Sequence, residues 1–386
     1  MFTEKERRRR LAAADSLMRE KGLSAMLIVG NGTIGNKAFG CFRYFIDNRI
    51  YYHMQLFAAI PGEEPIVCCG TQTHLLALNS RGVRDVRLVG DDVLGGAIKI
   101  LKEKNITSCR VGYCPEVTPA GWPGALRRAF PELELVDVTE DIYALRTLKS
   151  DEEISAARAG AAAADKAYER LCSFAAPGVS EMELAAELEY TMKKAGAEET
   201  YIALASGRFG DENDFPGSVH GASETGRSLL PGDCISVEMS PRWQGYWTQL
   251  VRTVCLGEPS EELRAAHEAC LYAMKNAAAA LKPGAAIRDI ADIICRSINE
   301  KGFEPSFPLG RVCGVDLFEE PLSAKSGLCL TEGMTVVLRP AVSRKGSSSV
   351  FHWGETFLVT ASSGESLAGC GSELRAILSK GGEAKC

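Results

Sequence analysis

The residues best suited to chemistry gather in the second half of this chain. Segment 232–253, GDCISVEMSPRWQGYWTQLVRT, predicts two strands joined by the turn Pro241–Gly245. Across such a hairpin, Glu238 and Gln249 can point into the same pocket. Three later segments combine strand patterns with charged residues, and we expect the functional site among all four. They are GRVCGVD at 310–316, EGMTVVLRP at 332–340 and GETFLVT at 354–360.

We expect two folding units to position these segments, because a chain of 386 residues is too long for one ordinary hydrophobic core. Residues 1 to about 140 alternate helical and strand patterns, which predicts a mixed α/β unit. The rest predicts an α+β unit with helices on one side of an antiparallel sheet, one of them opening with a Ser180–Glu183 capping box. The expected helices are Ser150–Cys172, Ser180–Ala195, Glu261–Leu281 and Ala286–Lys301. The expected strands are Cys234–Met239, Tyr246–Cys255, Met334–Leu338 and Glu355–Thr360.

Composition excludes several classes of partner. A net charge of -6 and a pI near 5.6 argue against binding to nucleic acid or to an anionic membrane surface. No apolar stretch approaches the length of a membrane span, and no signal peptide opens the sequence. The 14 cysteines are scattered without a CxxC pair, so we expect buried thiols in a cytoplasmic protein rather than a disulfide framework.

A linker-like segment, LRTLKSDEEI at 145–154, completes a recognisable series of motifs. With the four segments named above, it resembles in order and spacing the creatinase/prolidase/methionine-aminopeptidase superfamily. The resemblance covers nearly the whole chain. It implies a creatinase-like α/β N-terminal domain at 1–145 and an α+β domain of the pita-bread fold at 146–386. It also implies a homodimer that acts on a small-molecule substrate.

The same resemblance bears on metal binding. Metallopeptidases of this superfamily hold two divalent metals with two aspartates, one histidine and two glutamates. In this sequence the five positions fall, in order, on Glu238, Gln249, Arg311, Arg339 and Glu355. Arginine keeps its proton and offers no lone pair to a metal, and glutamine is neutral. We therefore expect a pocket without metal and a protein without a cofactor.

The resemblance also assigns an acid/base group. In creatinase, a member that works without metal, a histidine at the place of His220 shuttles protons during hydrolysis of a guanidino C–N bond. This implies catalysis by His220, with Glu238 and Glu355 as electrostatic partners. Two interpretations of Arg311 and Arg339 stay open: buried salt bridges with those glutamates, or capture of an anionic substrate group.

Four more residues are candidates for substrate binding. Gln249 shares the expected pocket with the residues above. In a regular strand His352 lies on the opposite face from Glu355, which predicts a residue at the pocket rim. By the resemblance, the N-terminal domain of a homodimer reaches over the pocket of the second subunit, which makes Arg43 and Arg49 candidates for substrate capture there; for either residue alone, ordinary surface pairing is the favoured interpretation.

Three functions remain open. The first is a metal-independent, creatinase-like hydrolase or lyase acting on a small C–N-bonded substrate that carries an anionic group. Creatine itself is disfavoured, because the positions that would hold its guanidino group fall on Val251 and Arg339. The second is a non-catalytic pseudoenzyme that binds a small ligand, a peptide or a protein. The third, an Xaa-Pro peptidase-like metallohydrolase, requires a different match at several positions.

Overall fold

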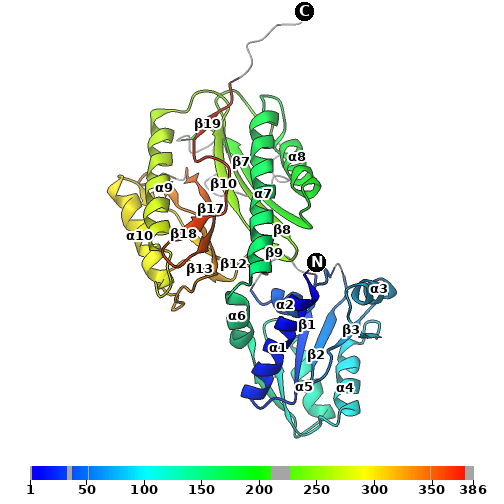
Figure 1. Cartoon of the computed structure of the whole chain (residues 1–386). Coiled ribbons are helices and arrows are strands. Elements are labelled where there is room, and N and C mark those ends of the chain that lie inside the picture. Colours follow the sequence, from blue (N-terminus) through cyan, green and yellow to red (C-terminus); the bar gives the residue numbers. More distant parts are fainter. Residues whose placement is uncertain (1, 33–36, 51, 210–226, 348, 379–386) are drawn as a thin grey trace, which may run out of the picture. The chain divides into compact units, whose positions relative to one another are not determined.

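The structure is a computed structural model that describes residues 2–32, 37–50, 52–209, 227–347 and 349–378. The chain divides into two compact units (Figure 1). Unit 1 comprises Met1–Leu148 and Val315–Glu319, and unit 2 comprises Lys149–Gly314 and Glu320–Cys386. No helix among the described residues combines the length and the apolar character that a membrane span requires.

Unit 1 is built on a mixed sheet in the order β4-β3-β2-β1-β5-β6. The parallel pairs β1–β5, β5–β6 and β3–β4 and the antiparallel pairs β1–β2 and β2–β3 give the α/β character that the sequence predicts. Its elements are α1 (Glu4–Glu20), β1 (Ala25–Gly30), α2 (Gly40–Phe45), β2 (Gln55–Ala59), β3 (Ile66–Cys69), α3 (Gln72–Ser80), β4 (Asp85–Leu88), α4 (Val93–Glu103), β5 (Arg110–Tyr113), α5 (Gly121–Ala129), β6 (Glu134–Asp137) and α6 (Thr139–Thr147).

A buried ion-pair group ties the segment Val315–Glu319 to the rest of unit 1. Arg146 of α6 is 1% exposed, and its Nη2 lies 2.6 Å from Asp316 Oδ2 and 2.8 Å from Glu319 Oε1. A buried guanidinium needs such partners, because its desolvation is otherwise uncompensated. Asp316 therefore helps to hold this segment against α6.

Unit 2 contains a sheet in the order β13-β12-β14-β17-β10-β8-β7, in which β18 also pairs with β17, β19 with β10 and β9 with β8. A small sheet, β11-β15-β16, accompanies it. The strands are β7 (Glu199–Gly207), β8 (Cys234–Trp243), β9 (Tyr246–Trp247), β10 (Leu250–Cys255), β11 (Glu304–Pro305), β12 (Gly310–Cys313), β13 (Glu320–Pro321), β14 (Thr335–Leu338), β15 (Ala341–Ser343), β16 (Phe351–His352), β17 (Gly354–Val359), β18 (Gly364–Ser366) and β19 (Arg375–Ala376).

Helices cover one face of this sheet (Figure 1), as predicted. Leu250 belongs to the core beneath α7 and α8, and Leu338 belongs to the core beneath α9 and α10. Both leucines are cross-strand partners of Glu355, so the two cores lie on the same face. The helices are α7 (Asp151–Phe174), α8 (Glu181–Lys194), α9 (Glu261–Ala280) and α10 (Ile287–Glu300). The predicted capping box of Ser180 and Glu183 is confirmed.

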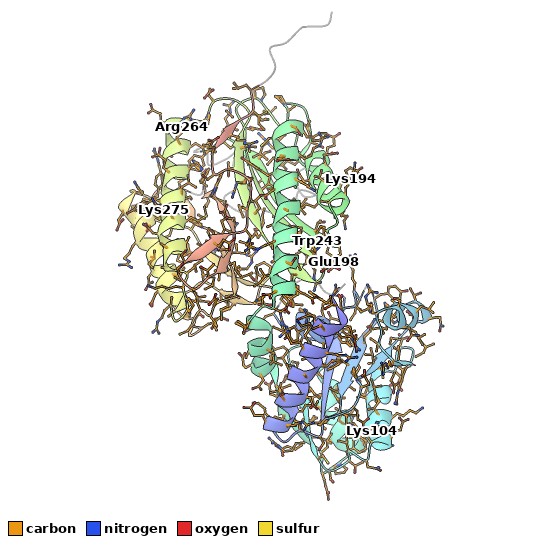
Figure 2. All side chains as sticks on the ribbon, viewed as in Figure 1. Lys104, Lys194, Glu198, Trp243, Arg264 and Lys275 are labelled. Carbon is orange, nitrogen blue, oxygen red and sulfur yellow. The ribbon has the colours of Figure 1, made fainter. Side chains whose placement is uncertain are left out.

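The strands differ from the prediction at one turn and at one strand that was not predicted. The turn expected at Pro241–Gly245 is shorter, because β8 continues to Trp243 and only Gln244 and Gly245, with φ of 46° and 89°, make the turn. Two consecutive residues at positive φ are typical of a type I′ hairpin, which suits the twist of the strands. Glu198, labelled in Figure 2 beside Trp243, accepts a 2.7 Å hydrogen bond from Gly245 N at this turn.

Strand β7 was not expected from the sequence at all. Its first residues are exposed or half-buried, whereas Ala203–Gly207 are buried, so no polar–apolar alternation marks the strand. The pairing of Tyr201 with Ser240 and of Ala203 with Glu238 shows why β7 matters: it borders the strand that carries the predicted site.

Candidate functional site

Strand register decides which predicted residues can share a site. Leu250 lies on the helix-covered face and is paired with Glu355, whereas the next residue, Val251, is paired with both Glu238 and Gly354. Successive side chains of a strand project to opposite faces, and direct cross-strand partners project to the same face. Glu238 and Gly354 therefore lie on the face opposite to these helices, which we call the open face. Glu355 lies on the face beneath the helices.

The expectation that Glu238 and Glu355 share one pocket is therefore wrong. An offset of one residue transfers a side chain to the other side of a sheet. The open-face position next to Glu355 is occupied by Gly354, which has no side chain. A Cβ atom there would meet Leu338 O at 2.6 Å and Arg339 Cα at 2.9 Å, so the close backbone leaves no room for a carboxylate.

Glu238 is the centre of the group on the open face, which we call the Glu238 site: Tyr201, Glu238, Ser240, Gln249, Arg311 and Arg339. Arg311 Nη2 donates a 3.1 Å hydrogen bond to Glu238 Oε1, and Arg339 Nε lies 3.7 Å from Oε2. Ser240 Oγ lies 3.4 Å from Oε1. Both arginines thus approach Glu238, and all three charged side chains are buried.

Arg339 is incompletely paired in this group. Its only ion pair among the described residues is the 3.7 Å contact with Glu238, and its buried Nε has no hydrogen-bond partner there. Burial lowers the pKa of the Arg339 guanidinium, Glu238 opposes this, and the positive charge of Arg311 adds to the lowering. A buried arginine in this state gains from any anion that approaches it.

Gln249 is held rigidly by its backbone and unsatisfied at its side chain. The Thr356 hydroxyl accepts from Gln249 N at 2.8 Å and donates to Gln249 O at 3.1 Å. Continuing the β8–β10 register by one step places Gln249 opposite Ser240, on the face of Glu238. The side chain is 2% exposed, and neither Nε2 nor Oε1 has a hydrogen-bond partner in the described part of the chain.

Tyr201 is a site residue that the sequence did not reveal. As the cross-strand partner of Ser240 it lies on the open face, and it remains 37% exposed. Burial and the charge of Glu238 raise the pKa of its phenol, while Arg311 and Arg339 oppose the rise. Its phenol therefore keeps its proton and can act as a donor. Because no polar–apolar alternation marks β7, the sequence carries no signal for Tyr201, and its pairing with Ser240 is what identifies it.

The helix-covered face carries a second carboxylate–arginine pair. Arg252 Nη2 lies 2.5 Å from Glu355 Oε2, and Ser366 Oγ donates to Oε1 at 2.6 Å. Arg252 Nη1 also donates to Gly354 O at 2.9 Å and to Val251 O at 3.0 Å. Arg252 is fully buried. Glu355 is thus enclosed in a hydrogen-bonded group and does not face Arg311 or Arg339 across a shared site.

His352 is buried rather than at a rim, with 5% exposure. Its neighbours Phe351 and Trp353 both contact the ring of His267 in α9. Alternation therefore directs His352 away from the helices, toward the side of Glu238. As predicted, it projects opposite to Glu355, but the face that it shares is that of the candidate site.

Three further predicted residues remain, His220, Arg43 and Arg49. His220 falls outside the described residues. Arg43 and Arg49 belong to unit 1, where Arg43 is buried and its Nη2 lies 2.9 Å from Asp47 Oδ1. Arg49 is half-buried. Their role across a homodimer interface stays a prediction, as does the homodimer itself.

The residues of the Glu238 site do not fit a pair of divalent metals. Hard and borderline cations need several anionic oxygen or neutral nitrogen donors. As described, the Glu238 site offers one carboxylate, a neutral amide and two guanidinium groups. Within the described ranges, no three His, Cys, Asp or Glu side chains are close enough to one another to hold a metal ion.

Each half of the chain matches the model of a known protein family. The model of metallopeptidase family M24 matches residues 155–361, and that of the creatinase/prolidase N-terminal domain matches residues 10–148. An uncharacterized peptidase of Bacillus subtilis, YqhT, is 30% identical over 239 residues, which are 60% of this chain and 65% of that protein. For the uncharacterized peptidase SSP1059 of Staphylococcus saprophyticus, identity is 30% over 62% of this chain and 68% of the relative.

Solved structures show the same fold. An Xaa-Pro dipeptidase from Bacillus anthracis is 22% identical, with a TM-score of 0.79 over 96% of this chain and 99% of that one. An X-Pro aminopeptidase from Thermotoga maritima is 21% identical, with a TM-score of 0.82 over 95% and 99% of the two chains. The predicted architecture, a creatinase-like α/β domain followed by a pita-bread domain, is confirmed.

Proposed function

We propose that this chain, which belongs to metallopeptidase family M24, is a metal-independent hydrolase of a small C–N-bonded substrate that carries an anionic group. The observation that carries the proposal is the arrangement of Arg311 and Arg339 about Glu238, with Nε of Arg339 lacking a hydrogen-bond partner among the described residues. Guanidinium charge is permanent, so it can bind an anion without prior loading of a metal.

The Glu238 site has the groups that such a reaction needs. Arg339 orients the substrate through its anionic group, because a planar guanidinium matches a carboxylate in two parallel hydrogen bonds. Hydrolysis adds water to the carbon and returns a proton to the departing nitrogen. Glu238 is suited to receive the proton from water, and the protonated Tyr201 is suited to supply one. His220, from the resemblance to creatinase, is the alternative proton carrier.

A second candidate function is binding without catalysis. It is favoured by one observation: Glu238 already accepts a hydrogen bond from Arg311, so its carboxylate is engaged within the protein. In this case the site would hold a small acid or the carboxylate of a peptide without turning it over. The Xaa-Pro peptidase activity named for similar structures would require metals that the described residues do not fit.

The test combines metal analysis with turnover. Full-length protein treated with EDTA is incubated with a panel of N-acyl and N-carbamoyl amino acids and Xaa-Pro dipeptides, and amine release is measured. We expect substoichiometric manganese, zinc and iron, and hydrolysis that persists in EDTA and drops at least about 100-fold in His220→Ala or Glu238→Gln. Stoichiometric metal with EDTA-sensitive dipeptide cleavage would overturn the proposal. Ligand binding without turnover of any panel member would favour the binding protein.

A further inference from the structure

We propose that Gln249 selects the substrate by pairing with an amide edge, an N–H donor and a C=O acceptor side by side. The ligand is then a small carboxylic acid that carries a ureido or primary carboxamide group. This inference rests on the proposed function, because Arg339 is assigned the carboxylate. It goes beyond it by naming the chemistry at the other end of the ligand.

The first argument is the unsatisfied amide of Gln249. Both its donor and its acceptor lack partners in the described part of the chain, although the side chain is 2% exposed. Buried polar groups are nearly always hydrogen-bonded, and each exception requires an explanation such as a ligand. The amide and Arg339 both belong to the Glu238 site, so a ligand held by Arg339 lies close to the amide.

The second argument is that the amide is positioned in advance. Thr356 Oγ1 contacts both backbone polar atoms of Gln249, at 2.8 Å and 3.1 Å. The backbone therefore cannot rotate to give the side chain another partner without losing these bonds. Because the backbone that carries it is fixed, the amide, which has no partner among the described residues, loses less freedom when it binds a complementary group.

The third argument is complementarity. A primary carboxamide or ureido group offers N–H and C=O on one edge and can form two hydrogen bonds with Gln249. A guanidino group has donors only, would leave Nε2 of Gln249 unpaired, and would be repelled by Arg311 and Arg339. A second carboxylate would leave Oε1 unpaired. The site therefore favours a neutral amide edge over either charged alternative.

The fourth argument is reach. Gln249 lies opposite Ser240 and is therefore the diagonal neighbour of Glu238 on the adjacent strand. Ser240 Oγ is 3.4 Å from the Glu238 carboxylate, which Arg339 also approaches. Neighbouring side chains on adjacent strands have Cβ atoms about 4.5–5.5 Å apart, and diagonal ones about 7–8 Å apart. An acid with one or two carbons between its carboxylate and its amide is long enough to contact both Arg339 and Gln249.

The test measures binding of four acids to EDTA-treated full-length protein by calorimetry. N-carbamoylglycine has the complete amide edge, and guanidinoacetate has donors only. N-acetylglycine has an N–H and a C=O that point in opposite directions, and butanoate has neither. We expect N-carbamoylglycine to bind at least about tenfold more tightly than the other three.

Variants separate the two proposals. Gln249→Glu, which is only an acceptor, should lose that preference and turn toward guanidinoacetate. Gln249→Leu should bind all acids equally and remain folded, because it removes an unsatisfied polar group. Arg339→Met should weaken all four acids alike.

Equal binding of the acids to the native protein, or an unchanged preference in Gln249→Glu, would overturn the amide-edge inference. Either result would leave the anion site standing if binding still depended on Arg339. Failure of every acid to bind would overturn both.

Discussion

The two faces of the unit 2 sheet each carry a buried carboxylate beside arginine, and the two groups differ in how completely they are paired. On the helix-covered face, Glu355 has Arg252 at 2.5 Å and the Ser366 hydroxyl at 2.6 Å. On the open face, the described atoms around the Glu238 carboxylate are Arg311 Nη2 at 3.1 Å, Ser240 Oγ at 3.4 Å and Arg339 Nε at 3.7 Å. Both oxygens of Glu355 thus have short bonds, whereas the contacts of Glu238 with described residues are all longer.

This difference distinguishes an ion pair that stabilises the fold from a group that can bind a ligand. Desolvation of a charge is offset only by good geometry and additional hydrogen bonds. The Arg252–Glu355 pair meets that condition within the protein. Among the described residues, Arg339 and Gln249 find no such set of partners, so a ligand can satisfy them. The predictions below test this comparison, from the largest expected effect to the smallest.

Removal of Arg252 should have the largest effect on stability. Arg252→Met leaves Glu355 buried without its cation, and such a loss typically destabilises a protein by about 3–5 kcal/mol. Urea unfolding of the variant measures the change. The double variant Arg252→Met/Glu355→Leu should recover much of it, because no unpaired charge remains. If Arg339→Met destabilises the protein as much as Arg252→Met, the two faces do not differ as described.

Arg339→Met should show the reverse pattern. We expect stability to change by no more than about 1 kcal/mol, because Arg339 has no hydrogen bond to lose among the described residues. Binding of a small carboxylic acid should weaken by at least about tenfold, as measured by calorimetry. Arg339→Lys is the matched control: it restores the charge but not the planar fork, so affinity should be intermediate. If Arg339→Met binds the acid as tightly as the native protein does, Arg339 does not take part in binding.

Gly354→Ala should test the close packing at the open-face position next to Glu355. The added Cβ would lie 2.6 Å from Leu338 O, which is backbone and cannot move aside as a flexible side chain would. Overpacking of this kind destabilises by about 1–3 kcal/mol. Thermal unfolding provides the measurement. A neutral effect would show that this face has room for a larger residue, and that a carboxylate could be restored there.

The pH dependence of stability should include a contribution from the helix-covered face. Burial of His267 lowers its pKa from 6.5, with the charge of Arg252 acting in the same direction. The unfolded state therefore binds more protons than the folded state as the pH falls through 6.5, and the folded state loses stability there. We expect the melting temperature of His267→Gln to fall less between pH 7 and pH 5 than that of the native protein. Parallel curves would contradict this assignment.

Local patterns along the chain were predictable because they depend on neighbours in sequence. The capping box at Ser180 is an example, and it is formed as expected. The placement of Glu355 was not, because a motif match fixes an order of residues but not a face of a sheet. Tyr201 was missed for a related reason: its strand shows no alternation, and only its pairing with Ser240 brings it to the site.

The sequence by itself determined the family and the loss of metal-binding side chains, because Gln249, Arg311 and Arg339 are unsuited to metals wherever they point. Only the tertiary structure decided which groups meet. Glu238 faces the arginines, Glu355 is enclosed by Arg252 and Ser366, and Gly354 takes the open-face position. The physical reason is the two-residue repeat of a strand, in which hydrogen-bond register assigns each side chain to a face.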